Sequence, residues 1–349
     1  MIIMKAKIKP SYDTNRKRLA DIIPLSAPFT IFIEPTRYCN FKCFYCLHST
    51  KDDKNGAWRM LGYRIKHMQF EMYEKILYDI KEFPERPKRI VFSGLGEPLM
   101  NPQLLRMIAK AKELNIADRL DILTNASLLT PELADALIES GVTRIQISLQ
   151  GLDALKYKEV AKVDLDFSKF YDNLKYLYEH KGDCTIFIKI IDALLDNEVD
   201  MNRFYNLFGD ICDQIYIEHL ITLQPPMGDH KGLADNSRNL HNEEVSYRHV
   251  CAVIFYMLQI DVDGNVYPCP VNGLPQELII GNIHVESLNR IWNGEKRINL
   301  IREHLKFNRN KIPGCSGCVS IACILDSNEY LDDVAGELLK RFNNFTKEM

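Results

Sequence analysis

The chain has 349 residues, of which 46% are hydrophobic and 26% charged, as is ordinary for a globular protein, and its formal net charge is −3. This balance lacks the basic field that nucleic acids and anionic membranes attract, so we expect no nucleic-acid or membrane partner. The longest nearly apolar run, residues 252–258, is far shorter than the roughly 20 residues that cross a bilayer, and the start has no continuous apolar segment typical of a signal peptide.

From Phe29 to about Ile221, short apolar strands alternate with amphipathic helices, which is typical of a parallel α/β sheet. Six strands are predicted, over residues 29–33, 89–92, 120–124, 144–149, 185–191 and 214–220. The predicted helices cover residues 69–83, 102–114, 131–140, 168–179 and 201–208. Six β/α units in this length favour a partial (β/α)6 TIM-like barrel, because a complete eight-unit barrel typically needs about 250 residues.

Beyond the barrel, a polar stretch rich in proline, glycine and asparagine covers residues 222–250 and is interpreted as a linker. A hairpin is predicted from residues 256–260 and 266–267 around the Asp263-Gly264 turn. Helices are expected near 287–304 and 332–342. We therefore predict an N-terminal extension (1–28), a barrel (29–221), the linker (222–250), a small domain (251–325) and a C-terminal helix (326–349).

Three cysteines follow the first predicted barrel strand directly, as Cys39, Cys43 and Cys46 in a C-x3-C-x2-C spacing. Thiolates are soft ligands that bind zinc, copper or iron–sulfur clusters. A structural zinc site normally has four protein ligands, whereas a four-iron cluster held by three thiolates leaves one iron open to another ligand. The ten cysteines are too sparse for a secreted disulfide scaffold, so we expect a cytoplasmic protein whose cysteines bind metal.

The cysteine loop resembles the cluster motif of the radical S-adenosylmethionine (SAM) superfamily, and Tyr45 stands where that family prefers an aromatic residue. Turns after the next strands resemble further family motifs in the correct order: Gly94-Leu95-Gly96-Glu97-Pro98, Thr124-Asn125 and Ser148-Leu149-Gln150-Gly151. Three positions differ from the family pattern, because Leu95, Ala126 and Gln150 replace a glycine, a glycine and an acid. The resemblance implies a cluster at the three cysteines and a SAM site with contacts from Tyr45, Gly94, Gly96, Glu97, Thr124, Asn125, Ser148 and Lys189.

A second set of cysteines lies in the predicted small domain. Cys251 and Cys269 form a C-x12-G-x4-C pattern with Gly264, and Cys315 and Cys318 form C-x2-C. Together with Gly281-Asn282-Ile283 and Ser287-Leu288, this pattern resembles the SPASM/twitch extension of radical SAM enzymes. The resemblance implies one auxiliary four-iron cluster bound by these four thiols. A zinc ribbon with the same four ligands is the alternative, and Cys323 is either a replacement ligand or a free thiol.

Two other cysteines, Cys184 and Cys212, are interpreted as buried apolar residues, because free cysteine is among the most buried residue types. The alternative is that one of Cys184, Cys212 and Cys323 returns a hydrogen atom to substrate, as the resemblance to radical epimerases implies. Lys189, Glu218 and Arg248 are candidate substrate contacts, as is His219 near the end of the sixth strand.

The resemblance implies that the chain cleaves SAM to a 5'-deoxyadenosyl radical, which abstracts hydrogen from a substrate. We expect a small polar substrate, such as a sugar, aminocyclitol or nucleotide-sugar, because only about 28 residues precede the barrel and they form no peptide-recognition domain. A two-electron oxidation that uses the auxiliary cluster is favoured, with a flavodoxin- or ferredoxin-like electron donor. The alternatives are a peptide-modifying maturase that crosslinks or epimerises residues, and a non-enzymatic iron–sulfur or zinc-binding module.

Overall fold

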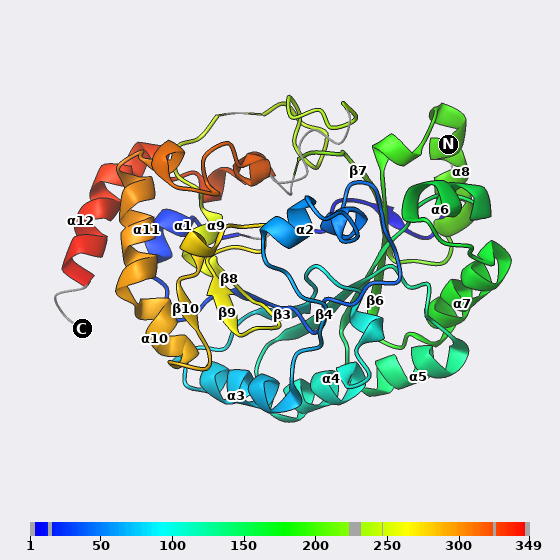
Figure 1. The fold of residues 1–349 in the computed structure, drawn as a ribbon, viewed down its shortest axis with the longest axis horizontal. Helices are drawn as coiled ribbons and strands as arrows, with labels where there is room; N and C mark the ends of the chain where they lie inside the picture. The colour runs from blue at the N-terminus through cyan, green and yellow to red at the C-terminus, as the bar shows by residue number, and fades with distance from the viewer. Residues whose placement is uncertain (1–3, 13–15, 223–231, 246, 324–325, 346–349) are drawn as a thin grey trace.

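The structure is a computed structural model that describes residues 4–12, 16–222, 232–245, 247–323 and 326–345. Within these residues the strands form a single sheet in the order β1-β7-β6-β5-β4-β3-β2-β8-β9-β10. Helices curve around the outer side of this sheet, and the C-terminal helices stand at one end of it (Figure 1). Residues 223–231 of the predicted linker lie outside the described residues.

Six parallel strands form the partial barrel that the sequence predicts, and none of their ends differs from the prediction by more than two residues. They are β2 (Thr30–Ile33), β3 (Arg89–Phe92), β4 (Arg119–Thr124), β5 (Arg144–Ser148), β6 (Thr185–Ile191) and β7 (Gln214–Glu218). The connecting helices are α3 (Phe70–Lys81), α4 (Leu104–Glu113), α5 (Pro131–Glu139), α6 (Ala154–Ala161), α7 (Phe167–His180) and α8 (Glu198–Phe208). A short helix, α2 (Ala57–Met60), follows the cysteine loop.

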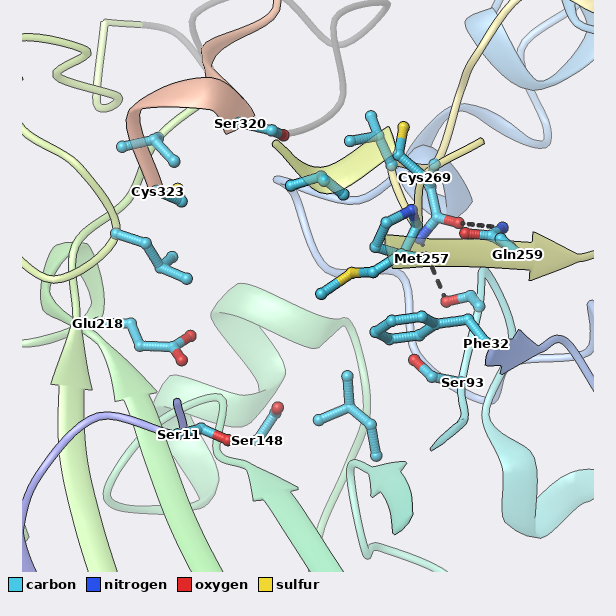
Figure 2. Close-up of a pocket in the computed structure, with 18 of the residues that line it drawn as sticks. Ser11, Phe32, Ser93, Ser148, Glu218, Met257, Gln259, Cys269, Ser320 and Cys323 are labelled. Carbon is cyan, nitrogen blue, oxygen red and sulfur yellow. Dashed lines mark hydrogen bonds between the residues drawn. The ribbon is translucent and has the colours of Figure 1, made fainter. Parts of the chain in front are cut away.

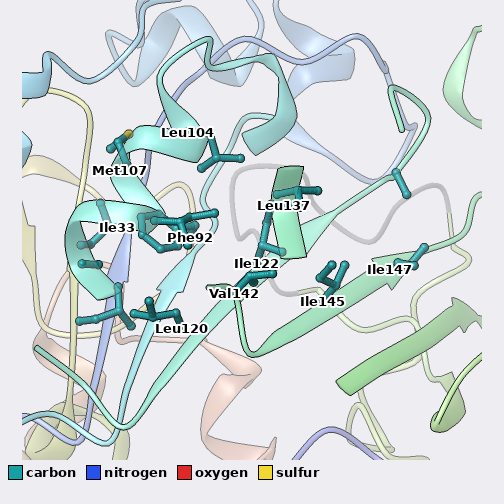
Figure 3. Close-up of a cluster of buried hydrophobic side chains, with 14 of the residues drawn as sticks. Ile33, Phe92, Leu104, Met107, Leu120, Ile122, Leu137, Val142, Ile145 and Ile147 are labelled. Atoms are coloured by element: carbon teal, nitrogen blue, oxygen red, sulfur yellow. The ribbon is translucent and has the colours of Figure 1, made fainter. Parts of the chain in front are cut away.

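The apolar residues of the barrel strands recur at alternate positions, because the outer face of the sheet is covered by helices. In β2, Ile31 and Ile33 are fully buried beneath the outer helices, whereas Phe32 between them lines a cavity on the other face. Figure 3 shows this outer core, where side chains of α4 and α5 meet those of β2 to β5. The alternation therefore separates a dry, packed outer face from an inner face that is available for a site.

The C-terminal part continues the barrel sheet, which the sequence analysis did not predict. Strand β8 (Met257–Ile260) pairs in parallel with β2, and β9 (Asn265–Tyr267) and β10 (Gly281–Asn282) follow in antiparallel pairing. The remaining helices are α9 (Val253–Tyr256), α10 (Leu288–Asn293), α11 (Glu295–Leu305) and α12 (Ala335–Phe345). Trp292 is fully buried in this part and donates its indole N–H to the Leu25 carbonyl at 3.0 Å.

Three local predictions need correction. The helix expected to start at Pro102 starts at Leu104, because the Asn101 side chain accepts from the backbone N–H of Gln103 and caps a preceding turn. The single helix expected over residues 287–304 is two helices, α10 and α11, because the chain is extended at Gly294. Tyr256 belongs to α9 rather than to the hairpin strand.

The N-terminal extension joins both parts of the molecule. Strand β1 (Lys7–Ile8) pairs in parallel with β7 at the open edge of the barrel. Helix α1 (Leu19–Ile22) packs in the C-terminal core, with Leu19 and Ala20 among residues that also include Phe255 and Phe342. No helix among the described residues has the length and apolar character needed to cross a membrane.

Candidate active site

A cavity of about 620 Å³ lies at the C-terminal ends of the barrel strands. Both sets of cysteines line it, and these are Cys39, Cys43, Cys46, Cys251, Cys269, Cys315 and Cys318. Figure 2 shows Ser148 and Glu218 at the ends of β5 and β7 on the lower wall, with Cys269 and Cys323 across the space. The fold thus brings together two cysteine sets that lie more than 200 positions apart in the sequence.

The first cysteine loop is held by its backbone and by amide side chains, among them Gln150. The N–H groups of Lys42 and Phe44 donate to carbonyls at the end of α6, at 2.9 and 3.3 Å. The Gln150 Oε1 accepts from the Tyr45 hydroxyl and from the Cys43 thiol, the latter at 3.4 Å. Gln150, which replaces the common acid of the family, therefore contacts the cysteine loop in this structure.

The turn after β3 passes very close to the backbone that enters the cysteine loop. A Cβ atom at Gly96 would stand 2.1 Å from the carbonyl oxygen of Thr36, so only glycine allows this approach. Gly94 has φ +151° and faces the Glu34 side chain, whose Oε1 accepts from the Leu95 N–H at 3.0 Å. The displaced glycine pattern thus still gives a tight turn beside the thiols.

Glu97 links the turns after β3 and β4. Its Oε1 accepts from the Thr124 hydroxyl at 2.5 Å and from the Leu99 N–H at 3.1 Å, and its Oε2 accepts from the Asn125 N–H at 2.7 Å. Burial raises the pKa of Glu97 to about 7, although these donors act in the opposite direction. An ammonium group beside this carboxylate would favour its ionised form. This suits the contact with SAM that the family resemblance implies for Glu97.

Charged side chains line the opposite wall of the cavity. Lys189 at the end of β6 contacts Glu218 at the end of β7, with Nζ and Oε2 2.6 Å apart. His219 also lines the cavity, and its Nδ1 lies 2.5 Å from Asp192. Arg248 is not among the lining residues, and its guanidinium stacks over the Tyr330 ring instead, so the structure does not support it as a substrate contact.

The second cysteine set belongs to a wall that is buried and rich in sulfur. Burial raises the pKa of Cys251 to about 12 and that of Cys315 to about 11, so these thiols need a strong positive charge to ionise. Arg309 donates from Nη2 to the Cys318 carbonyl at the same wall. A thiol set of this kind fits an iron–sulfur cluster, which supplies such a charge.

A single zinc ion fits these thiols less well. Zn–S bonds of about 2.3 Å hold the sulfurs of a tetrahedral site roughly 3.8 Å apart. In the described part of the chain, no group of three or more His, Cys, Asp or Glu side chains is arranged to hold one metal ion. The four thiols do line one cavity, which agrees with ligands of a larger multi-iron cluster.

Of the three candidate hydrogen donors, Cys323 lines the cavity and the other two do not. Cys184 and Cys212 are buried in the barrel core, where the Cys212 thiol donates to the Phe208 carbonyl at 3.2 Å. Their position agrees with the interpretation as packing residues and gives neither of them access to substrate. Cys323 faces Glu218 across the cavity (Figure 2).

The sequence analysis missed several residues of the site. Ser11, Tyr12 and Arg16 of the N-terminal extension line the cavity, and His304 of α11 does so on the auxiliary side. None of them belongs to a motif, and their arrival depends on long-range packing. Glu34 and Arg37 were also missed. They do not line the cavity, but their buried ion pair lies next to the turn after β3, and a carboxylate and a guanidinium three residues apart at a strand end are a visible signal.

Comparisons with known proteins agree with this geometry. A family model described as the radical SAM superfamily matches residues 33–204, and one described as an iron–sulfur cluster-binding domain matches residues 251–319. A tungsten-containing aldehyde ferredoxin oxidoreductase cofactor-modifying protein of Pyrococcus furiosus is 34% identical over 122 residues, which is 35% of this chain and 31% of that protein. The chain spans about a third to two fifths of the length of the first curated relatives it matches.

Solved structures share the fold over most of the chain. The structure of BtrN in complex with AdoMet and 2-DOIA covers 83% of this chain and 92% of its own, with 19% identity and a TM-score of 0.54. That of Streptococcus suis SuiB bound to S-adenosylmethionine covers 91% and 79%, with 15% identity and a TM-score of 0.57. At these identities the likeness concerns the fold. The two family models and the paired cysteine sets together show that this chain belongs to the radical SAM superfamily and carries a SPASM iron–sulfur domain.

Proposed function

We propose that the chain oxidises a small polar substrate by two electrons, as a dehydrogenase of the radical SAM superfamily. The observation that carries this proposal is the single cavity, which has the three-cysteine loop on one wall and the four-cysteine set on another. When bound, SAM and the two clusters supply a 5'-deoxyadenosyl radical that takes a hydrogen atom and an acceptor for the remaining electron. A substrate in this cavity would lie within reach of both.

The SAM site in this proposal is formed by the turns after β3, β4 and β5. Glu97 would bind the ammonium group of SAM while Thr124 and Asn125 hold the Glu97 carboxylate in place. Tyr45, Gly94, Gly96 and Ser148 line the same part of the cavity and would shape the walls against the cofactor. The cysteines of the loop would hold the SAM-binding cluster as thiolates, and Gln150 would stay against the loop through the Tyr45 hydroxyl.

Substrate recognition is assigned to the charged pair on the opposite wall. Oxidation of an alcohol or amine carbon releases a proton, and the Glu218 carboxylate is the group that we assign to accept it. Lys189, 2.6 Å away, would hold Glu218 in position and donate to a substrate oxygen. A cavity of about 620 Å³ that must also contain SAM leaves room for one small molecule or one residue of a peptide.

The experiment measures turnover under anaerobic conditions, first with an artificial reductant and then with a flavodoxin- or ferredoxin-like electron donor in its place. We expect aminocyclitols, hexoses or nucleotide-sugars deuterated at one carbon to transfer deuterium to 5'-deoxyadenosine and to yield one carbonyl for each molecule cleaved. Glu218→Gln should lower product formation strongly, whereas Glu295→Gln, at an exposed position, should not. Deuterium transfer only from peptides would refute the small-molecule substrate.

A second candidate is a redox-neutral epimerisation, which the position of Cys323 favours. In that reaction the Cys323 thiol returns a hydrogen atom to the substrate radical, and the external donor restores the thiol with one electron and one proton. A peptide substrate is compatible with this chemistry, and SuiB has been seen bound to its precursor peptide SuiA. Solvent deuterium in an inverted product, lost in Cys323→Ala but retained in Cys212→Ala, would support epimerisation over oxidation.

A further inference from the structure

One buried donor on the auxiliary side of the cavity has no partner. His304 lies in the last turn of α11, has no solvent-exposed surface, and lines the cavity together with Cys251, Cys315 and Cys318. Its Nε2 atom is buried and makes no hydrogen bond to any described residue. A buried polar atom without a partner costs free energy, so the unpaired imidazole nitrogen of a residue that lines the cavity beside these cysteines indicates a missing acceptor or donor.

The backbone of Cys251 determines whether the Nε2 atom of His304 is a hydrogen-bond donor or an acceptor. The Cys251 N–H donates to the His304 Nδ1 at 3.3 Å, so Nδ1 presents its lone pair there. A neutral imidazole carries one N–H, and it must therefore be on Nε2. Ligation of iron by Nε2 would need a lone pair on Nε2 and a proton on Nδ1, where the Cys251 N–H already points. The geometry thus makes His304 a hydrogen-bond donor and excludes it as a ligand in this arrangement.

We infer that His304 donates its Nε2–H to a sulfur atom of the auxiliary cluster site formed by Cys251, Cys269, Cys315 and Cys318, and so raises the reduction potential of that cluster. Hydrogen bonds to cluster sulfurs stabilise the more negative, reduced form. Arg309, whose guanidinium lines the same wall and donates to the Cys318 carbonyl, adds a positive charge in the same direction. The pair makes this cluster a better electron acceptor.

This inference depends on the auxiliary cluster and not on the proposed dehydrogenation, because a raised potential is measurable without substrate. Two substitutions separate the two nitrogens of His304. Asparagine places its Oδ1 near the position of Nδ1, so His304→Asn keeps an acceptor for Cys251 and loses the distal donor. His304→Gln places its amide near Nε2, so it keeps the distal donor and loses the acceptor.

The test is a redox titration of the cluster-loaded enzyme, followed by electron paramagnetic resonance. Loss of one such hydrogen bond is expected to change the ratio of reduced to oxidised auxiliary cluster about tenfold at a fixed potential. For a one-electron couple, this tenfold change means that the reduction potential of the auxiliary cluster is about 59 mV lower in His304→Asn than in the native protein. His304→Gln should stay close to the native value, and the SAM-binding cluster, as an internal control, should not change in either variant.

The unmodified enzyme supplies an independent readout. Histidine labelled with nitrogen-15 should show a weak coupling to the reduced auxiliary cluster, together with a coupled proton that exchanges in D2O. A strong coupling, typical of a nitrogen bound to iron, would overturn the inference. An unchanged potential in His304→Asn would overturn it as well. Equal shifts in both variants would also overturn it, because the effect would then not depend on the distal donor that His304→Gln keeps.

Discussion

Arg37 is the centre of a buried ion network that joins the cysteine loop to the auxiliary hairpin. Its Nε lies 3.1 Å from Glu34, and its two terminal nitrogens lie 2.9 Å from Asp261 and 2.6 Å from Asp263. Arg37 is only 2% exposed, and Glu34 and Asp261 are 1% and 3% exposed. Glu34 also accepts from the backbone N–H groups of Leu95 and Val262, so it connects the turn after β3 to the turn after β8.

Replacing Arg37 by methionine would leave buried carboxylates without their cation. Removing one partner of a buried ion pair typically costs about 3–5 kcal/mol, and we expect an apparent loss of unfolding free energy in that range. Arg86→Met is the matched control, because its pair with Asp118 is about half exposed and is worth at most about 1 kcal/mol. Adding Asp261→Asn to Arg37→Met should recover part of the loss, because it removes one unpaired charge.

The assay is urea unfolding followed by circular dichroism, at pH 8 and at pH 5. Burial raises the pKa of Glu34 and of Asp261, and Arg37 acts in the opposite direction, so its removal should raise both pKa values further. A carboxyl whose folded pKa exceeds its unfolded value loses stability as pH rises, so the defect should be smaller at pH 5. A loss no greater than that of Arg86→Met, or a defect independent of pH, would refute the reasoning.

Three further substitutions test the site. Cys39→Ala should abolish 5'-deoxyadenosine release and lower bound iron and sulfide, whereas Cys184→Ala, in the barrel core, should leave both unchanged. Gly96→Ala places a methyl group 2.1 Å from a backbone oxygen and should cost about 1–3 kcal/mol in urea unfolding. Gly336→Ala, with open space around it, should cost nothing, and equal stabilities would contradict the close approach. In Glu97→Gln, the amide NH2 group replaces a carboxylate oxygen and points at the Thr124 hydroxyl or the Asn125 N–H, which are both donors. Calorimetry should therefore show roughly tenfold weaker binding of SAM. An unchanged dissociation constant would remove Glu97 from the SAM site.

The barrel strands were predictable because their signal is local. Each is a short apolar run between a helix and a polar turn, and the strands from Thr30 to Glu218 lie within two residues of their predicted ends. The Thr130-Pro131 cap likewise encodes the start of α5 in neighbouring residues, since the Thr130 hydroxyl accepts from the Leu133 N–H. Helix α6 was missed because its eight residues, with Tyr157 and Val160 buried, carry only a weak amphipathic pattern.

By itself, the sequence determined the cofactors of this protein, because thiol spacing and strand-end turns are set by residues that are near one another in the chain. It could not determine which distant segments share the cavity. The parallel pairing of β8 with β2, the position of Cys323 opposite Glu218, and the unpaired Nε2 of His304 all depend on contacts between residues far apart in sequence. Such contacts follow from the packing of whole elements, which no local pattern records, and only the tertiary structure decided that both cysteine sets face one space.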